Sequence, residues 1–504
     1  MNYECIPALS DARNIKISAS SFAYIRDNSM PSSFFKYCAS LGANGFTKTE
    51  EYSTAVRYFA AYTNGKCDVF VNYYPRTKSL TAVCENNCSY SEYTDTARSY
   101  SCTVLSQITQ IALDEFGMSY LIRLQDGRFI IIDGGREYSQ EADRLWKAIC
   151  EQCANDKPTV AAWFLSHIHM DHMNCFNVFM EKYGESIVLE KVMVNFPDLN
   201  DIERIPEIDA YFEQFYKVHV PLAYENAERA GAAVYNVHSG QRYFIGDAEC
   251  EILSCLDDTL DTVPTTLNAT SVIMRMKLAG QTILWSTDGA FGNAKLAERY
   301  GDYLKSDILQ VPHHGFRSGD ADAEMRTYDL IKPSVCLIPA SADTTYNWFC
   351  SYVNSTDYLI RALDADEIIV GTPQRRITLP YTPGAYRKDE YKADYLRGRD
   401  SCGAETWIFS ELSSANPEAF NFTLINMTNF DTTVFIDLYF EGQNKIIRGV
   451  TEVVKAQSLR IANILENDDR KVPENTPFAV RFVSQTPIVV SHKTHSAVHH
   501  GINR

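Results

Sequence analysis

The segment Ser166-His167-Ile168-His169-Met170-Asp171-His172 follows directly after the apolar run Val160–Leu165. The run predicts a buried strand, and active-site residues commonly lie on loops where such strands end. The loop holds three histidines and one aspartate, all of metal-ligating type. If the first two histidines face one cation, the aspartate and the last histidine can face a second one nearby. Such ligands suit borderline cations such as zinc, and a position open to water makes a site catalytic.

Chance clustering and helix capping are the alternative explanations of this loop. The chain has only 11 histidines among 504 residues, so chance explains an HxHxDH pattern poorly. Two later segments also end an apolar run at a residue of metal-ligating type. The run Thr282–Thr287 leads into Asp288, and Ile308–Pro312 leads into His313 and His314. Taken alone, these would be ordinary turn residues, but beside the histidine loop they predict a binuclear site in which the carboxylate bridges.

Length, composition and charge set the outer limits. A chain of 504 residues with 45% hydrophobic and 12% aromatic residues predicts two or three packed domains. The formal net charge of -17 argues against an extended nucleic-acid surface, although it does not exclude a nuclease whose metal ions supply positive charge. The amino terminus lacks a basic segment followed by an apolar one, and no apolar run has the length of a membrane span. We therefore expect a soluble cytoplasmic protein without a membrane partner.

The 14 cysteines are spread along the chain rather than packed into a short secreted module. Several lie in apolar runs, where free thiols pack as small hydrophobic groups, so reduced cysteines are the simplest interpretation. Two pairs have spacings that a structural zinc uses, but neither has a partner pair at finger-like spacing: Cys84 with Cys88, and Cys150 with Cys153.

Residues 1–104 are interpreted as a small α+β module of unknown role. A helix is expected over Ser32–Leu41, and the polar stretch Ser89–Ser101 is typical of a linker. Strands are expected at Ala55–Ala61, Cys67–Tyr74 and Ser79–Cys84.

Over residues 105–388 strands alternate with helices. Tyr120–Leu124 and Phe129–Asp133 are joined by Asp126-Gly127, a hairpin signal, and a helix is expected over Gln140–Cys153. The helical segments between the later strands predict sheets covered by helices rather than an all-β domain. These strands are expected at Ile187–Val194, Tyr243–Leu253, Ser271–Lys277, Thr282–Ser286, Ile308–Val311 and Val335–Ile338.

The central segments resemble the metallo-β-lactamase superfamily of hydrolases over roughly residues 108–385. The matching pieces are FIIIDGG at 129–135, SHIHMDH at 166–172, WSTDGA at 285–290 and VPHHGF at 311–316. The resemblance implies an αββα sandwich of two packed β-sheets, with the site in a cleft at their edge and one or usually two divalent ions. In that scheme His167 and His169 hold the first ion, Asp171 and His172 hold the second, and Asp288 bridges them.

The resemblance also implies roles around these ligands. One of His313 and His314 completes the second site and the other faces the substrate; His314 is the preferred ligand, and His313 is expected to act in catalysis. Asp133 is expected to support the loop from behind, in the shell that orients metal ligands. Asp171 can also orient the attacking water or shuttle its proton to the leaving group. Arg317 is a candidate partner for a substrate phosphate, with a solvated loop arginine as the alternative.

One departure from the family pattern changes the expected chemistry. Where the family's third motif supplies a further histidine, this chain has Asn268 in the sequence NATSV. With HHG, this pattern is similar to the branch containing the hydrolase domain of bacterial competence-related DNA-uptake proteins and bacterial phosphorylcholine esterases. His238 is a weaker candidate for the missing ligand and is interpreted as a surface turn residue. Zinc is favoured, with manganese or iron as alternatives.

The resemblance thus implies a binuclear metal-dependent hydrolase of a phosphodiester or related phosphate ester, using a metal-activated hydroxide. The segment Pro197–Glu228, rich in aromatic and charged residues, is expected to shape one wall of the cleft. Hydrolysis of a thioester, lactone or amide by the same fold is one alternative. A non-catalytic ligand-sensing or assembly protein is the other.

Residues 400–504 alternate between apolar and polar side chains in short runs, which predicts an antiparallel β-sandwich. Four segments of this region resemble the family of sensory rhodopsin transducers. They are TWIFSEL, FTLINMTNFDTTVFIDLYFEG, KAQSLRI and VPENTPFAVRFVSQTPIVVSHKTHS. That family tends to assemble into tetramers, so the resemblance implies a binding module or a homo-oligomer formed through this domain. The whole chain is therefore expected to be an α+β multidomain protein.

Overall fold

A computed structural model describes residues 5–18, 21–86, 103–114, 116–154, 157–199, 205, 210–259, 266–289, 291, 295–316, 321–340, 365, 367–371, 374–382, 404–426, 431–442, 446–464 and 472–492. The chain divides into two compact units, residues 1–341 with 369–381 and residues 342–368 with 382–504. Within the described ranges, no helix combines the length and the apolar character that a membrane crossing needs. The finer division into three domains stays a prediction.

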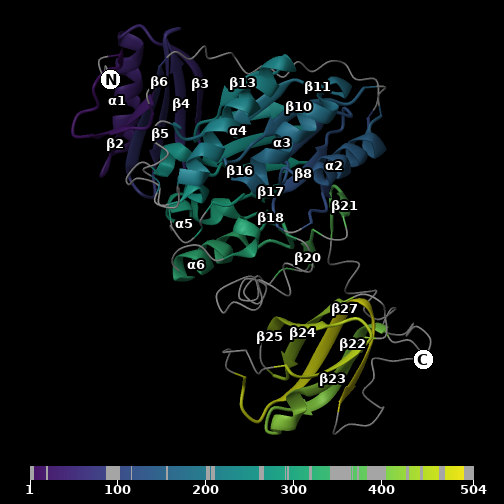
Figure 1. Cartoon of the computed structure of the whole chain (residues 1–504). Helices are drawn as coiled ribbons and strands as arrows, with labels where there is room; N and C mark the ends of the chain where they lie inside the picture. The colour runs from purple at the N-terminus through teal and green to yellow at the C-terminus, as the bar shows by residue number, and fades with distance from the viewer. Residues whose placement is uncertain are drawn as a thin grey trace. The chain divides into compact units, whose positions relative to one another are not determined.

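The first unit begins with a six-stranded antiparallel sheet in the order β1-β2-β6-β5-β4-β3, with helix α1 (Pro31–Ala43) packed on one face (Figure 1). Both faces are covered, so β5 is buried at all eight of its positions. The predicted helix is present, and so are the predicted strands, the first of which begins later than expected, at Tyr58. The strands are β1 (Arg13–Lys16), β2 (Ser21–Arg26), β3 (Thr47–Ser53), β4 (Tyr58–Thr63), β5 (Cys67–Tyr74) and β6 (Ser79–Asn86).

The face of this sheet away from α1 packs against the following domain. The guanidinium of the fully buried Arg57 donates to two carbonyls near the end of β15, at 2.9 and 3.0 Å. The ring of Phe70 stacks on the imidazole of His238. His238 also contacts Glu85 Oε2 at 2.8 Å and Asp257 Oδ2 at 2.9 Å, and only 3% of its surface is exposed. The interpretation of His238 as a surface turn residue is therefore wrong.

Two further sheets face each other in the centre of the first unit. The first sheet has the order β13-β12-β10-β9-β8-β7-β21, and β11 also pairs with β10. Its strands are β7 (Gln107–Gln110), β8 (Ser119–Arg123), β9 (Phe129–Asp133), β10 (Thr159–Phe164), β11 (Val188–Leu189), β12 (Lys191–Val194), β13 (Ala233–Asn236) and β21 (Arg375–Thr378).

The second sheet has the order β14-β15-β16-β17-β18-β19-β20. The predicted strand Tyr243–Leu253 is in fact a hairpin of two strands that turns at Gly246. The strands are β14 (Arg242–Ile245), β15 (Ala248–Ser254), β16 (Ile273–Leu278), β17 (Gln281–Trp285), β18 (Ile308–Gln310), β19 (Val335–Ile338) and β20 (Glu367–Val370).

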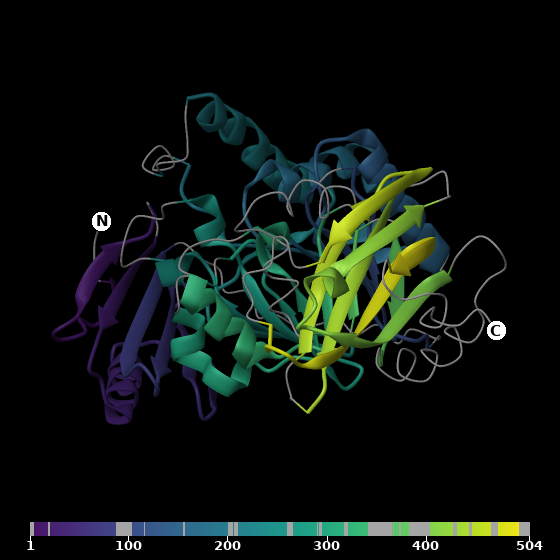
Figure 2. The same ribbon diagram turned by 90° about the horizontal axis from the view of Figure 1, so that it is seen from below.

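The alternation of side chains explains the layers. In β9, Ile130 and Ile132 point into the core between the sheets, where they join Trp285 from β17. Phe129 and Ile131 point the other way, into the core under the helices α2, α3 and α4. A strand covered on both faces reads as a continuous apolar run, as FIII does here. Helices α5 and α6 lie beside the second sheet (Figures 1 and 2), and the predicted αββα arrangement is confirmed.

The helices of this domain connect the strands and cover the sheets. The helix predicted over Gln140–Cys153 is present as α2. The helices are α2 (Ser139–Gln152), α3 (Met170–Tyr183), α4 (Ala210–Arg229), α5 (Lys295–Tyr300) and α6 (Ala321–Ile331). Short 3-10 turns lie at η2 (Gly184–Ser186), η4 (Leu256–Thr259), η5 (Leu267–Thr270), η6 (Gly301–Leu304) and η7 (Pro312–Gly315).

The second unit contains an antiparallel β domain around one core, as predicted. Its longest strand, β27 (Pro477–His492, yellow in Figures 1 and 2), pairs with β24 through residues 478–484 and with β23 through residues 489–492. One strand therefore joins β24 to β23 within a six-stranded sheet. The other elements are β22 (Ala404–Ser413), η10 (Pro417–Phe420), β23 (Asn421–Asn426), β24 (Thr432–Phe440), β25 (Ile446–Val454) and β26 (Ser458–Asn463).

Candidate metal centre

Asp133, at the end of β9, organises the histidine loop from behind. Its carboxylate accepts hydrogen bonds from the backbone N–H and the hydroxyl of Ser166, both at 2.7 Å. The second of its oxygens also lies 2.7 Å from Nδ1 of His172. A buried carboxylate at this place fixes which ring nitrogen of His172 carries the proton and directs the other nitrogen outward. Asp133 thus contacts the histidine loop at both Ser166 and His172.

The first group of ligand-type side chains consists of His167, His169 and Asp288. Their ligand atoms lie within 4.8 Å of one another. His167 Nε2 lies 2.9 Å from His169 Nδ1 and 3.9 Å from Asp288 Oδ2, while His167 Nδ1 contacts the Ser166 hydroxyl at 2.9 Å. His169 is the residue before α3, so the loop both ends a strand and begins a helix.

The second group consists of Asp171, His172 and His314, again within 4.8 Å of one another. His314 Nε2 lies 3.1 Å from Asp171 Oδ2 and 3.3 Å from His172 Nε2. Its Nδ1 donates to the Pro339 carbonyl at 2.9 Å. Asp288 Oδ2 lies 3.2 Å from His172 Nε2 and 3.3 Å from His314 Nε2, so this one oxygen adjoins both groups.

His313 and Asn268 lie together beside these groups. The amide nitrogen of Asn268, in η5, lies 3.0 Å from Nε2 of His313. The structure thus brings His314 rather than His313 into the group around Asp171. The sequence had assigned Asn268 to the place of a missing histidine, and here its side chain contacts the histidine that faces the cleft.

Left-handed backbone conformations occur where the contributing strands end. Asp133, Thr287, His313 and His314 have φ between 50° and 56°. Residues other than glycine adopt this conformation at a cost, and such residues gather at functional sites. Buried Gln310 holds two of these turns together, because its amide accepts from the Thr287 N–H at 2.5 Å and donates to the carbonyl of Thr287 at 3.3 Å and of Val311 at 2.6 Å.

The electrostatics of the two groups favour cations. Burial raises the pKa of Asp171 and Asp288, but His172 and His314 outweigh it and hold both carboxyls well below their usual range. Burial lowers the pKa of His314, but Asp288 and Asp171 outweigh it and raise this pKa to about 9. Burial lowers the pKa of His167, and its neighbours His172 and His169 lower it further.

Buried polar atoms around the site support the same conclusion. Asp288 Oδ1, His313 Nδ1 and Asn268 Oδ1 are buried and have no hydrogen-bond partner among the described residues. Buried polar atoms are normally paired, so unpaired ones in one place point to an absent ion, water or substrate. Imidazole nitrogens and carboxylate oxygens within 4.8 Å of one another form a donor set that zinc, manganese or iron accepts.

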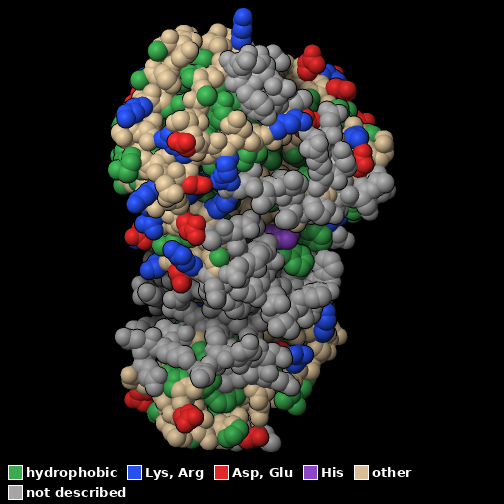
Figure 3. Space-filling view, turned by 90° about the vertical axis from the view of Figure 1, so that its left-hand side faces the viewer, with side chains coloured by type: hydrophobic (Ala, Val, Ile, Leu, Met, Phe, Trp, Pro, Cys, Tyr) green, Lys and Arg blue, Asp and Glu red, His purple; other side chains and the backbone are tan. Residues whose placement is uncertain are grey.

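A cleft of about 280 Å³ opens onto these side chains. Phe212 and Tyr216 of α4 line it, so the segment Pro197–Glu228 contributes to its wall. Histidine atoms reach the surface beside hydrophobic side chains in Figure 3. The lining also includes Phe116, His169, Met170, Asp171, Asn268, Asp288, His313, His314 and Phe316.

Sequence reasoning missed some of the contributors. Gln310 interrupts the apolar run Ile308–Val311 directly before the paired histidines, and that interruption was an available signal. The sequence around Phe116 gave no signal that this residue lines the cleft, because no metal-ligating motif lies near it. Arg317 lies outside the described residues. His238, the weaker candidate for the missing ligand, pairs with Glu85 and Asp257 and belongs to neither group.

Two family models match the sequence. The model described as the metallo-beta-lactamase superfamily matches residues 113–197, and the model described as Anabaena sensory rhodopsin transducer matches residues 404–500. Comparison with curated proteins found no match.

Solved structures resemble parts of the chain. The Anabaena sensory rhodopsin transducer is 24% identical and covers 19% of this chain and 87% of its own, with a TM-score of 0.17. The metallo-beta-lactamase fold protein YhfI from Bacillus subtilis is 13% identical over 54% of this chain and 99% of its own, with a TM-score of 0.31. The metallo hydrolase Igni18 from Ignicoccus hospitalis is 12% identical over 55% of this chain and 100% of its own, with a TM-score of 0.33. On the family models, the chain joins a metallo-beta-lactamase superfamily domain to a C-terminal domain of the sensory rhodopsin transducer family.

Proposed function

We propose that the central domain is a binuclear metal-dependent hydrolase that acts on a phosphodiester or related phosphate ester. The observation that carries the proposal is the position of Asp288 Oδ2, which lies within 3.9 Å of histidine nitrogens from both groups. An oxygen that adjoins two ligand groups is suited to bridge two cations.

His167, His169 and Asp288 would hold one ion, and Asp171, His172 and His314 would hold the other, with Asp288 shared. Zinc is the ion we propose, because imidazole predominates in the donor set. Two bound divalent ions supply a hydroxide near neutral pH and withdraw charge from the bond to be cleaved.

The chain's own residues have separate tasks in the cleft. Asp171 has the place and the ionised carboxylate to orient the attacking water. His313 faces the cleft and is positioned by Asn268 to contact the substrate. Phe116 and Phe316 offer apolar surface that excludes bulk water and contacts an organic group of the ester.

A phosphate ester is preferred over a thioester, lactone or amide for two reasons. Its negatively charged oxygens would suit a site that holds two divalent cations. The chain also has Asn268 in the sequence NATSV, and with HHG this pattern resembles the branch that contains the phosphorylcholine esterases.

The test is a hydrolysis screen of the full chain over phosphodiesters, phosphomonoesters, thioesters and lactones, with zinc, manganese and iron supplied separately. We expect phosphodiester turnover that Asp288→Asn and His169→Ala each lower more than about 100-fold, because removal of even an outer partner of a metal ligand costs up to that factor. The metal content per chain should fall together with turnover.

The matched control is Asp302→Asn, since Asp302 is an exposed carboxylate outside both groups. It should leave turnover and metal content unchanged. Turnover that survives Asp288→Asn would refute the proposed site. Turnover of a thioester or lactone alone would refute the substrate class, and a lack of tightly bound metal would favour a ligand-sensing or assembly role.

A further inference from the structure

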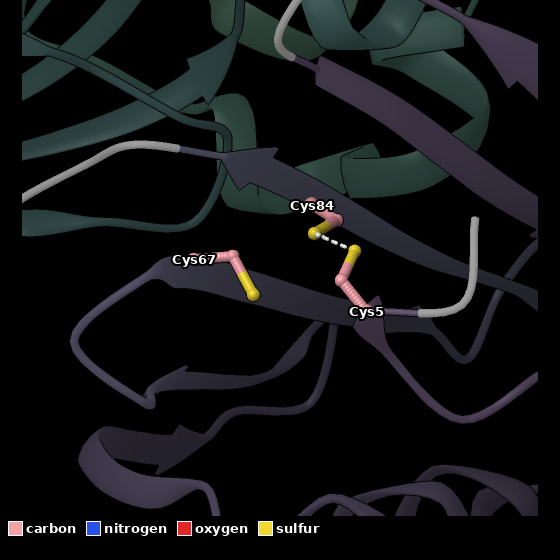
Figure 4. Close-up of side chains that lie close together, drawn as sticks. All are labelled: Cys5, Cys67 and Cys84. Atoms are coloured by element: carbon pink, nitrogen blue, oxygen red, sulfur yellow. Dashed lines mark hydrogen bonds between the residues drawn. The ribbon is translucent and has the colours of Figure 1, made fainter. Parts of the chain in front are cut away.

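Three cysteines that lie far apart in the sequence gather at one place in the N-terminal sheet (Figure 4). Cys5 precedes β1, Cys67 begins β5, and Cys84 lies in β6. Their sulfur atoms all lie within 4.8 Å of one another, and Cys5 Sγ lies 3.7 Å from Cys84 Sγ. Cys67 and Cys84 are buried, and Cys5 is partly exposed.

The sheet register explains how two of these thiols meet. Val69 of β5 pairs with Cys84 of β6, so Cys67 is the diagonal neighbour of Cys84 on the same face. Diagonal side chains on adjacent antiparallel strands are within reach of one another. The sequence spacing of these cysteines gives no hint of the cluster, because β6 returns beside β5 only in the folded sheet.

The third thiol is delivered by the segment before β1. Ile6 and Leu9 of this segment are buried in the core beneath α1. The hydroxyl of Tyr37, on α1, donates to the Pro7 carbonyl at 3.1 Å. These contacts hold the segment in place, so Cys5 is positioned over the sheet by packing that does not involve its own sulfur.

The spacing of the sulfurs fits a shared cation better than a disulfide. A disulfide needs about 2.05 Å between its sulfurs, well below the 3.7 Å between Cys5 Sγ and Cys84 Sγ. Zinc binds sulfur at about 2.3 Å, so two thiolates on one tetrahedral zinc are about 3.8 Å apart. A disulfide would also use two of the thiols and leave the third without a role.

The surroundings of the thiols favour the same assignment. The three sulfur atoms lie within 4.8 Å of one another, and Cys67 and Cys84 are buried, so a cation held between them would be largely shielded from water. Thiolates are the ligands that select zinc and softer cations from the harder magnesium and calcium.

We propose that Cys5, Cys67 and Cys84 form a second, thiolate metal site that binds one zinc ion and ties the N-terminal segment to strands β5 and β6. As three sulfur–zinc bonds form, three S–H protons pass to solvent, and a water or other exogenous ligand completes the tetrahedron. The site does not depend on the proposed hydrolase activity, because none of its residues belongs to the His/Asp groups.

Cobalt substitution of the full chain tests the site, because the His/Asp groups contain no sulfur. The metal-free protein, kept reduced, is loaded with Co²⁺ and its absorption spectrum is recorded. We expect a thiolate-to-cobalt charge-transfer band that is lost in Cys84→Ser and in the triple serine variant of Cys5, Cys67 and Cys84. The band should persist in Asp288→Asn, which impairs only the other site.

The matched control is Cys38→Ser, because Cys38 is a cysteine of the same core that lies outside the group of three. It should keep the charge-transfer band. X-ray absorption at the zinc edge of the unaltered protein gives a second measurement that a misfolded variant cannot affect, and it should show sulfur at about 2.3 Å.

Three results would overturn the proposal. They are the lack of a charge-transfer band in the unaltered protein, a band that persists in the folded triple variant, and a zinc edge without a sulfur shell. A disulfide between Cys5 and Cys84, detected by mass spectrometry of the protein purified without reductant and stable to added zinc, would replace the metal assignment with a redox one.

Discussion

Gln310 shows how much a candidate metal site can depend on a side chain that touches no metal ligand atom. It is fully buried at the end of β18, and its amide bonds to the turn that carries Asp288 and to the backbone just before His313. The ligands come from different strands, so some group has to set the distance between the strand ends. Gln310 sets this distance between the ends of β17 and β18.

Replacement of Gln310 by methionine should therefore weaken metal binding more than its effect on folding suggests. The variant Gln310→Met leaves the N–H and the carbonyl of Thr287 without their side-chain partner, which lets the Asp288 turn move. We expect zinc affinity at the His/Asp groups to fall about 10- to 100-fold in a competition titration against a chelator.

Gln152→Met is the matched control, since Gln152 is also a buried amide and bonds to Thr109 and to the Ala148 carbonyl. Both variants should lose about 1–3 kcal/mol in the free energy of unfolding, because each leaves buried polar groups unpaired. An equal loss of zinc affinity in both variants would mean that Gln310 acts only through general stability.

The candidate site was visible in the sequence because each of its segments begins where an apolar strand ends. Asp133, His167, Asp288 and His314 all stand where a buried run stops, and a strand ending at a polar residue needs no tertiary information to be noticed. The partners of His238 were not visible. Glu85 is 153 residues away, and only the docking of two sheets brings the pair together.

At the scale of elements, long apolar strands such as β9 and β10 were predictable and polar strands such as β3 were not, while β2 was missed although five of its six residues are buried. β9 and β10 have five and six buried residues in a row, which gives a strong apolar signal. β3 has the sequence TKTEEYS and none of its residues is fully buried, so it shows no alternation to detect. The edge strand β3 is held by backbone pairing with β4. The pattern of side chains along a sequence does not reveal such backbone pairing.

The contact between the N-terminal sheet and the central domain should depend on pH through His238. Burial acts to lower its pKa, but Asp257 of η4 and Glu85 of β6 outweigh burial and raise it to about 10. The unfolded value is near 6.5. Because the folded pKa lies above the unfolded one, the stabilisation is fully present below about pH 6.5 and is lost as the pH rises through 10.

We expect the difference in the free energy of unfolding between the natural protein and His238→Gln to shrink by on the order of 3 kcal/mol between pH 6 and pH 10.5. Urea unfolding at a series of pH values measures it. His219→Gln is the control, because His219 also stacks on a phenylalanine, yet burial lowers its pKa. Its difference should stay constant above pH 6.5, and a constant difference for His238→Gln as well would contradict the prediction.

At the scale of the whole molecule, the C-terminal domain is the part for which we predict self-association. We propose that the C-terminal domain forms a homo-oligomer through β26. Among the described strands β26 pairs with β23 alone, and two large apolar side chains are exposed on it, Leu459 at 56% and Ile461 at 73%. An edge strand that exposes apolar side chains offers a surface for a second copy of the same strand.

The double variant Leu459→Lys with Ile461→Lys should therefore shift the full chain towards the monomer. Sedimentation velocity over a range of concentrations measures the change. Phe244→Lys is the control, because Phe244 is 58% exposed on β14 in the other unit. If the natural protein is monomeric at all concentrations, or if Phe244→Lys dissociates it equally, the assignment of β26 is wrong.

The left-handed turns at Asp133, Thr287, His313 and His314 set a limit on how this protein can adapt. Each costs about 1 kcal/mol or more relative to a relaxed backbone, and the surrounding sheets supply that energy. In a lineage that moves to a hotter habitat, substitutions that relax these turns could not raise the stability of the protein without cost. They would move the side chains that the turns present to the cleft. Its heat tolerance would have to come from the cores and surfaces away from the cleft.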